Sequence, residues 1–311
     1  MSLYRVPILV NGATHSAEQF RAMVQDLARG AEGITQGGDL KVTQLSTPGT
    51  SVQVGDGSGV VRGRVSPFQG TYSVRNQGAA TVPIAATGGS GRSDMVILRI
   101  EDPEYEGSLD PAVAQINYFQ VISGVSSSAT TIPDGRTGIP LARIDIPAST
   151  STITNAMIVD IRKVANPRQQ RTFLTQSPTA LSTDIGGTSG TFTNFSTAAG
   201  WSIAIPDWAT TAVLALSVGQ IRYNTDSYFG KLRATFGASL TVQPVNLDDN
   251  QTGVRRSTVV LGDTLTIPSA YRGTSQTLRF QASGVSPNPG KVGVDGSTTF
   301  IADVTFYEAP R

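Results

Sequence analysis

The chain has 311 residues, a length that suggests two domains of about 150 residues each. Charged residues make up only 15% of it and the formal net charge is +1, so it lacks the overall field that would attract nucleic acid or an anionic membrane. The chain contains no cysteine and one histidine, His15, which excludes disulfides, thiolate metal sites, cysteine nucleophiles and histidine-rich zinc sites.

The N-terminal part predicts one strand and one helix. Residues 3–10 form a short apolar run typical of a strand. Ser16 followed by Gln19 has the form of a capping box, and a helix is expected over about residues 17–29, with Arg21 facing water. The apolar face of this helix contains Ala17, Phe20, Met23, Val24, Leu27 and Ala28. If that face packs on a sheet, truncating Phe20 or Leu27 to Ala destabilises the domain by roughly 2–5 kcal/mol.

From Asp39 onward the pattern becomes β. Short apolar stretches alternate with Gly- and Pro-rich turns, and residues 95–100 are apolar enough for a central strand. Residues 141–146 alternate apolar and polar, and Pro147 ends that strand because it has no N–H to continue a ladder. The first domain is therefore predicted to be a β-sandwich or partly rolled sheet with one helix laid on its side.

A polar stretch containing Pro167 divides the chain. Residues 1–166 are assigned to the first domain, residues 167–171 to a linker and residues 172–311 to a second domain. The second part shows many short strands with turn signals between them, which suits an antiparallel sandwich of jelly-roll type. The fold class expected for the whole chain is all-β, with two antiparallel β-sandwich domains.

Three segments carry a resemblance to a known family. They read VNGATHSAEQFRAMVQDLARGAEGITQGGDLKVTQL, SDMVILRIEDPEY and IPLARIDIPASTSTITNAMIVDIRKVANPR. In this order they resemble the first domain of minor tail proteins of phages with long, non-contractile tails (siphoviruses), particularly phages of actinobacteria. The resemblance covers about residues 7–168 and has no counterpart in residues 172–311.

The resemblance implies a structural, non-enzymatic component of a tail tip or tail fibre. The first domain would attach to the distal tail through other tail-tip or baseplate proteins, and the second would be presented to the host cell surface, where a cell-wall glycan is the expected ligand. Such a protein is made in the host cytoplasm and ends up in the virion. A homotrimer is expected, with residues 3–10 stacked between copies, and no cofactor, metal, nucleic acid or membrane insertion is expected.

Candidate receptor-binding residues come from the second domain. Sugar-binding surfaces use aromatic faces together with Asp or Asn hydrogen bonds. Tyr228, Asp249 and Tyr271 flank predicted turns and are expected at the surface. The loops that contain them, residues 224–228, 248–253 and 269–273, are expected at one end of the sandwich.

Two alternatives stay open. The first is a tail-borne glycan hydrolase or depolymerase that uses a carboxylate pair. Its candidate residues are Glu101, Asp102, Glu104, Asp248 and Asp249. The acidic residues 101–110 are otherwise expected to be a solvated hairpin connection, or a loop that holds a cation. The second alternative is a free-standing carbohydrate-binding module.

Overall fold

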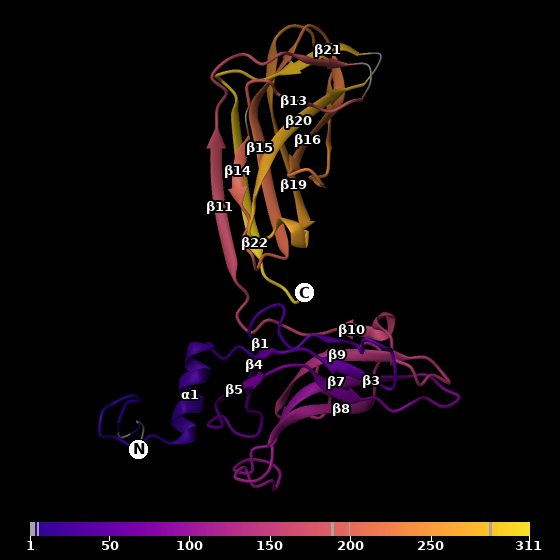
Figure 1. Cartoon of the computed structure of the whole chain (residues 1–311). Coiled ribbons are helices and arrows are strands. Elements are labelled where there is room, and N and C mark those ends of the chain that lie inside the picture. Colours follow the sequence, from indigo (N-terminus) through magenta and orange to yellow (C-terminus); the bar gives the residue numbers. More distant parts are fainter. Residues whose placement is uncertain (1–3, 5, 188–189, 199, 286–287) are drawn as a thin grey trace. The chain divides into compact units, whose positions relative to one another are not determined.

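The computed structural model describes residue 4 and residues 6–187, 190–198, 200–285 and 288–311. The chain forms two compact units (Figure 1). Unit 1 consists of Met1–Pro167 and Ala309–Arg311, and unit 2 of Arg168–Glu308. Both units are built from antiparallel sheets, so the predicted all-β class is confirmed. No helix in the described ranges combines the length and apolar character needed to span a membrane.

The described residues of unit 1 form three small sheets and one α-helix. Its elements are α1 (Ala17–Leu27), β1 (Gly33–Ile34), β2 (Val42–Gln44), β3 (Ser51–Val54), β4 (Gly57–Arg62), β5 (Thr71–Asn76), β6 (Ala80–Pro83), β7 (Arg92–Ile100), β8 (Asn117–Val125), β9 (Gly138–Ile146), the 3₁₀-helix η1 (Asn155–Met157) and β10 (Ile158–Asp160). The strand orders are β1-β4-β5, β2-β3-β6 and β10-β9-β7-β8. β7 and β9 are the inner strands of the largest sheet and are mostly buried, as the apolar run at residues 95–100 predicts.

The ends of α1 follow from local chemistry. The Ser16 hydroxyl accepts a hydrogen bond from the Gln19 N–H at 3.2 Å, and the Gln19 side chain accepts one from the Ser16 N–H at 3.0 Å. This capping box confirms the prediction. The helix ends at Leu27, and Arg29 (φ 54°) and Gly30 (φ 72°) then take left-handed conformations that stop it.

The predicted buried face of α1 is wrong for Phe20 and Leu27, although Ala28, which belongs to that face, is buried. Arg21 is buried, whereas Phe20 is 41% and Leu27 75% exposed. α1 packs against β5 through the side that carries Arg21. The predicted N-terminal strand is also wrong where it can be assessed: the described residues among 3–10, namely 4 and 6–10, form no strand, and residues 3 and 5 lie outside the described ranges. The Gln19 side chain donates instead to the Val6 carbonyl, at 3.2 Å.

Unit 2 is a sandwich of two antiparallel sheets. Its elements are β11 (Gln169–Gln176), β12 (Ile185–Gly187), β13 (Thr193–Asn194), β14 (Trp201–Ala204), β15 (Thr211–Asn224), β16 (Tyr228–Phe236), β17 (Leu240–Thr241), β18 (Val245–Asp249), β19 (Arg255–Thr266), the 3₁₀-helix η2 (Ser269–Tyr271), β20 (Ser275–Gly284), β21 (Asn288–Gly293) and β22 (Thr299–Tyr307). One sheet has the order β11-β22-β15-β19, with β21 and β12 continuing from β15. The other has the order β14-β20-β16-β18, with β13 and β17 at its margins.

This strand order is that of a jelly roll, in which the first long strand pairs with the last. The core between the sheets combines aliphatic and aromatic side chains, and Phe280 and Phe300 stack at a centroid distance of 4.8 Å. The structure differs from the sequence expectation at the start of the unit. β11 begins at Gln169, inside the expected linker at residues 167–171, because Gln169 and Arg171 already pair with β22.

Candidate functional site

The acidic residues 101–110 belong to an ion-pair network in unit 1. Arg21 Nη2 lies 2.8 Å from Glu104 Oε2, and Arg21 Nη1 lies 3.5 Å from Asp102 Oδ2. The Tyr72 hydroxyl donates to Asp102 Oδ2 at 2.7 Å, and burial together with this hydrogen bond raises the pKa of Tyr72. A guanidinium taken out of water needs such partners to offset its lost solvation. These carboxylates therefore hold the helix in place.

The other acidic side chains of this loop are also bound. Arg99 donates to both oxygens of Glu106, at 3.2 and 3.1 Å. The Tyr118 hydroxyl donates to Glu101 Oε2 at 2.7 Å, and the pKa of Tyr118 is raised by burial and by this hydrogen bond. The segment is a hairpin connection between β7 and β8, as expected, but it is only partly solvated, because Glu101, Asp102 and Glu106 pack onto unit 1 through their carboxylates.

The hydrolase alternative requires a carboxylate pair that can act as acid and base across a groove. Glu101, Asp102 and Glu104 are occupied by Tyr and Arg partners in unit 1. Asp248 and Asp249 belong to unit 2, and Asp249 Oδ1 lies 2.5 Å from Arg255 Nε. These contacts use Glu101, Asp102, Glu104 and Asp249 for structure, whereas Asp248 is exposed on β18.

A bound cation needs several carboxylate, carbonyl or imidazole ligands in one place. Within the described ranges, no three Asp, Glu or His side chains gather into a group that could hold a metal ion. His15 lies beside the N-cap of α1, where its Nε2 accepts a hydrogen bond from the Leu9 N–H at 3.2 Å.

Tyr228, predicted at the surface, is buried. It is 1% exposed, and its hydroxyl donates to the Ser283 carbonyl at 2.9 Å. Burial raises the pKa of Tyr228, and the neighbouring Tyr223 adds to the shift. Gly230 is needed beside it, since a Cβ there would lie 2.7 Å from the Tyr228 hydroxyl oxygen and 2.1 Å from the Ser283 carbonyl oxygen. Tyr228 is therefore a core residue, and its assignment as a receptor contact is wrong.

Asp249 and Tyr271 do not lie at one end of the sandwich. Asp249 pairs with Tyr228 at the start of β16, whereas the Tyr271 hydroxyl accepts hydrogen bonds from the Ser239 N–H and hydroxyl at 2.8 and 2.9 Å, just beyond the end of β16. These hydrogen bonds lower the pKa of Tyr271. The length of β16 separates the two residues by about 26 Å, at about 3.3 Å per residue. The predicted single cluster is not formed.

Phe229, the residue after Tyr228, faces solvent in place of Tyr228. Side chains alternate along a strand, so Phe229 points outward and is 46% exposed. It pairs across the sheet with Asp248, which is also exposed. The adjoining loop, residues 250–254, is exposed throughout. An aromatic ring beside a carboxylate, rimmed by an exposed loop, is an arrangement that suits saccharide contacts.

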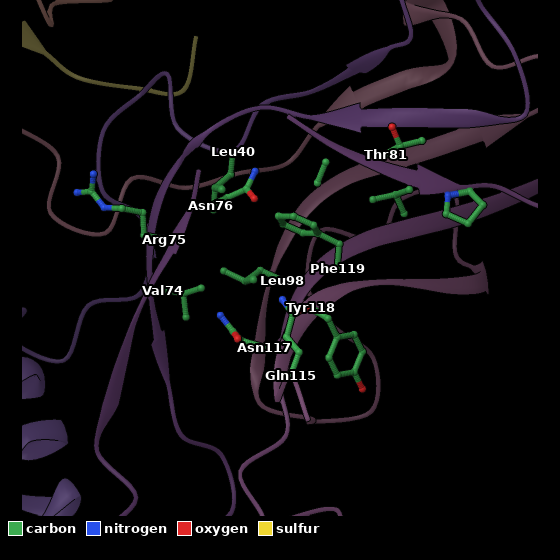
Figure 2. Close-up of a pocket in the computed structure, with 13 residues that line it drawn as sticks. Leu40, Val74, Arg75, Asn76, Thr81, Leu98, Gln115, Asn117, Tyr118 and Phe119 are labelled. Carbon is green, nitrogen blue, oxygen red and sulfur yellow. The ribbon is translucent and has the colours of Figure 1, made fainter. Parts of the chain in front are cut away.

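Unit 1 contains a pocket of about 280 Å³ (Figure 2). It lies between β5, β6 and β8, each of which is an edge strand of its own sheet. Figure 2 shows the Phe119 ring toward Leu40 and Asn76, whereas the Tyr118 ring points away from them. The described lining residues are Leu40, Val74, Arg75, Asn76, Ala80, Thr81, Val82, Pro83, Leu98, Gln115, Asn117, Tyr118 and Phe119. This lining offers amides, one guanidinium and apolar surface but no carboxylate or imidazole, so it suits binding rather than acid–base chemistry.

Comparisons with known proteins give little further guidance. No protein-family model and no curated protein matches the chain. Among solved structures, the VP2 subviral particle of infectious bursal disease virus is similar at 11% identity and a TM-score of 0.26, over 90% of this chain and 79% of that one. The T13 particle of the same virus aligns at 13% identity and a TM-score of 0.25, over 94% and 86%. The insecticidal delta-endotoxin Cry8Ea1 of Bacillus thuringiensis aligns at 9% identity and a TM-score of 0.19, over 92% and 55%. Similarity at this level does not define a shared function.

Proposed function

We propose that the chain is a structural component of a phage tail tip or tail fibre. In this proposal unit 1 attaches to the distal tail and unit 2 is presented for binding to a host cell-surface glycan. One observation carries the proposal. The resemblance to minor tail proteins covers about residues 7–168, and unit 1 ends at Pro167. The segment that resembles the family therefore coincides with one compact unit.

The connections between the units suit an exchangeable outer module. The chain enters unit 2 at Arg168 and leaves it at Glu308. The Glu308 N–H donates to the Arg168 carbonyl at 3.1 Å, and the Arg168 guanidinium donates to both Glu308 carboxylate oxygens at 2.9 and 2.8 Å. Because entry and exit are adjacent, a whole unit 2 can be replaced without changing the path of unit 1. The host receptor varies and the tail does not, so this is the arrangement that a receptor-binding module needs.

Within unit 2 we place host contact on the outward side of β16 and β18. Phe229 and Asp248 supply an exposed ring and carboxylate, and residues 250–254 form the adjoining loop. Asp249 supports this surface through Arg255, whose guanidinium also donates to the Asp226 carbonyl at 2.8 Å. Tyr271, at the far end of β16, would belong to a separate contact.

Attachment of unit 1 to another tail-tip or baseplate protein would use the open edge of β8. This nine-residue strand carries neither Pro nor a charged residue, the two devices that usually protect an edge from pairing. It borders the pocket of Figure 2, where an extended segment of a partner could pair with the strand and place side chains in the pocket. Homotrimeric assembly and location in the virion are parts of the same proposal.

The test replaces residues 168–308 with a short Gly/Ser linker, so that Ala309–Arg311 keep their place on unit 1. The Arg311 N–H donates to the Gly37 carbonyl at 2.8 Å, a contact that a plain truncation would remove. Particles carrying this variant are expected to assemble and to lose adsorption to host cells. A matched variant, Phe229→Ala with Asp248→Ala, should assemble and adsorb weakly. Normal adsorption without unit 2 would overturn the adhesive role, and failure of the linker variant to enter particles would overturn the attachment role of unit 1.

A further inference from the structure

One face of unit 2 is an ordered grid of outward side chains. Strands β11, β22, β15 and β19 lie side by side, and their register places outward residues in four ranks of four. The ranks are Gln169, Tyr307, Thr211 and Thr266; Arg171, Thr305, Val213 and Thr264; Phe173, Asp303, Ala215 and Gly262; and Thr175, Ile301, Ser217 and Val260. These sixteen residues are named the neutral face.

The neutral face carries no unpaired charge. Its two ionic residues are Arg171 and Asp303, which form a bidentate pair with N–O distances of 2.8 and 2.7 Å. The other fourteen side chains are uncharged and most are short. Phe173 is 58% and Val260 68% exposed, so the apolar members of this face meet solvent in the single chain.

The opposite sheet of the same unit is different. On β16 and β20 the outward residues include Lys231, Arg233 and Arg279, and β18 adds Asp248. This mixture of charges is usual for a sheet face that is solvated in the single chain. The contrast lies within one sandwich, so it reflects a difference between the two faces and not the composition of the chain.

The neutral face also has a defined end. A bulge in β15 between Val218 and Ile221 interrupts the register with β19. Beyond it the ionic residues return: Arg222 pairs with Asp184 at 3.0 Å, and Arg256 pairs with Asp295. The uncharged area is therefore bounded at this end of the sheet.

We infer that the neutral face is a contact surface between copies of this chain. A different partner selected by charge would need a complementary field, and this face offers none. Two copies of it can meet without like-charge repulsion and without desolvating a lone ion. Four strands about 4.8 Å apart and seven residues long span roughly 440 Å². A contact between two such faces therefore covers about 900 Å² before side-chain relief is added, just below the ~1,000 Å² that a specific contact should exceed. The inference depends on unit 2 alone and holds whatever particle contains the chain.

The test measures the mass of the full chain by sedimentation equilibrium from about 1 to 200 µM. The neutral-face variant is Ala215→Glu, at an exposed position in the centre of the grid. The matched control is Ala204→Glu, an exposed alanine on β14 in the opposite sheet. The wild-type chain is expected to exceed its single-chain mass of 32.6 kDa. Ala215→Glu should raise the dissociation constant at least tenfold, and Ala204→Glu should leave it unchanged.

Three results would overturn the inference: a wild-type chain that stays at 32.6 kDa throughout, assembly of Ala215→Glu with wild-type affinity, or equal weakening by both variants. Circular dichroism melting checks that each variant folds. If Ala215→Glu does not fold, Thr264→Glu on the edge strand β19 makes the same test, because that exposed side chain can extend into solvent. Attachment to particles is not used as a readout, so a failure here would remove contact between copies, including the proposed homotrimer, but would leave tail attachment and host adhesion untouched.

Discussion

Arg21 in α1 donates a hydrogen bond from Nε to the backbone carbonyl of Gln69, at 2.8 Å. The residue that follows, Gly70, has φ 75°, and a Cβ there would lie 2.7 Å from the Arg21 Cβ. The helix thus approaches the backbone closely, with its guanidinium reaching on to Glu104 and Asp102. This contact fixes which face of α1 is buried.

The first prediction compares the two faces of the helix. Arg21→Ala removes a buried cation from its carboxylates and should destabilise unit 1 by about 3–5 kcal/mol. Leu27→Ala alters a side chain that is 75% exposed and should change stability by no more than about 0.5 kcal/mol. Urea denaturation of the full chain measures both. A larger loss of unfolding free energy for Leu27→Ala than for Arg21→Ala would show that the helix buries the face predicted from the sequence.

The second prediction concerns alkaline pH. The pKa of Tyr228 is raised by burial, so the unfolded chain loses this proton first, near its ordinary pKa of about 10. The native state then binds more protons than the unfolded state, and stability falls as pH rises above about 10. Tyr228→Phe should cost about 1–3 kcal/mol at pH 8, because the Ser283 carbonyl loses its donor. The difference in unfolding free energy between wild type and Tyr228→Phe should be smaller at pH 11 than at pH 8. Urea denaturation measures it, and an equal difference at both pH values would contradict this.

The third prediction concerns acid. Hydrogen bonds from Arg143, assisted by the Ser93 hydroxyl, lower the pKa of Asp145, and Arg256 lowers that of Asp295. A carboxyl whose folded pKa lies below its unfolded value of about 3.9 stabilises the fold above that pH, and the stabilisation is lost as pH falls through the folded pKa. Asp145→Asn should therefore be less stable than wild type at pH 7 and close to it at pH 2.5. Equal differences at both pH values would show that the ionised carboxylate is not the cause.

The fourth prediction concerns the boundary of unit 2. A fragment of residues 168–308 should melt cooperatively, since its strands and core are complete. A fragment of residues 172–308 loses the Arg168–Glu308 pair and the first rungs of β11. The lost charge-assisted hydrogen bonds alone should cost about 1.5–3 kcal/mol. Calorimetry of both fragments checks this; equal melting temperatures would place the boundary at residue 172, where the sequence suggested it.

Local signals in the sequence predicted the elements well. The Ser16–Gln19 box specified where α1 begins, and Pro147 marked the end of β9, because both effects involve residues close together in the chain. The all-β class and a sandwich of jelly-roll type were predicted from the spacing of apolar residues and turns, whereas the strand order came from the structure.

Contacts between residues far apart in the chain could not be predicted from the sequence. Helical periodicity marks two faces, but Arg21 is buried by carboxylates more than 80 positions later. Along β16 the period of two left Tyr228 and Phe229 as alternatives, and a shift by one residue exchanges core and surface. Tyr228 was placed at the surface because it follows a turn, and Phe229, which does face outward, was missed. One signal could have identified Phe229 as the outward residue. Leu232 and Ala234 are typical core residues, and they lie on the same side of β16 as Tyr228.

The most direct test of the proposed function is the position of unit 2 on purified particles of the phage to which the proposal assigns the chain. Gold-labelled antibodies raised against residues 168–308 can be viewed on purified particles by electron microscopy, with particles lacking the chain as the control. The account predicts label at the distal end of the tail. Label on the head or along the tail shaft, or purified particles in which mass spectrometry finds no peptide of this chain, would contradict it.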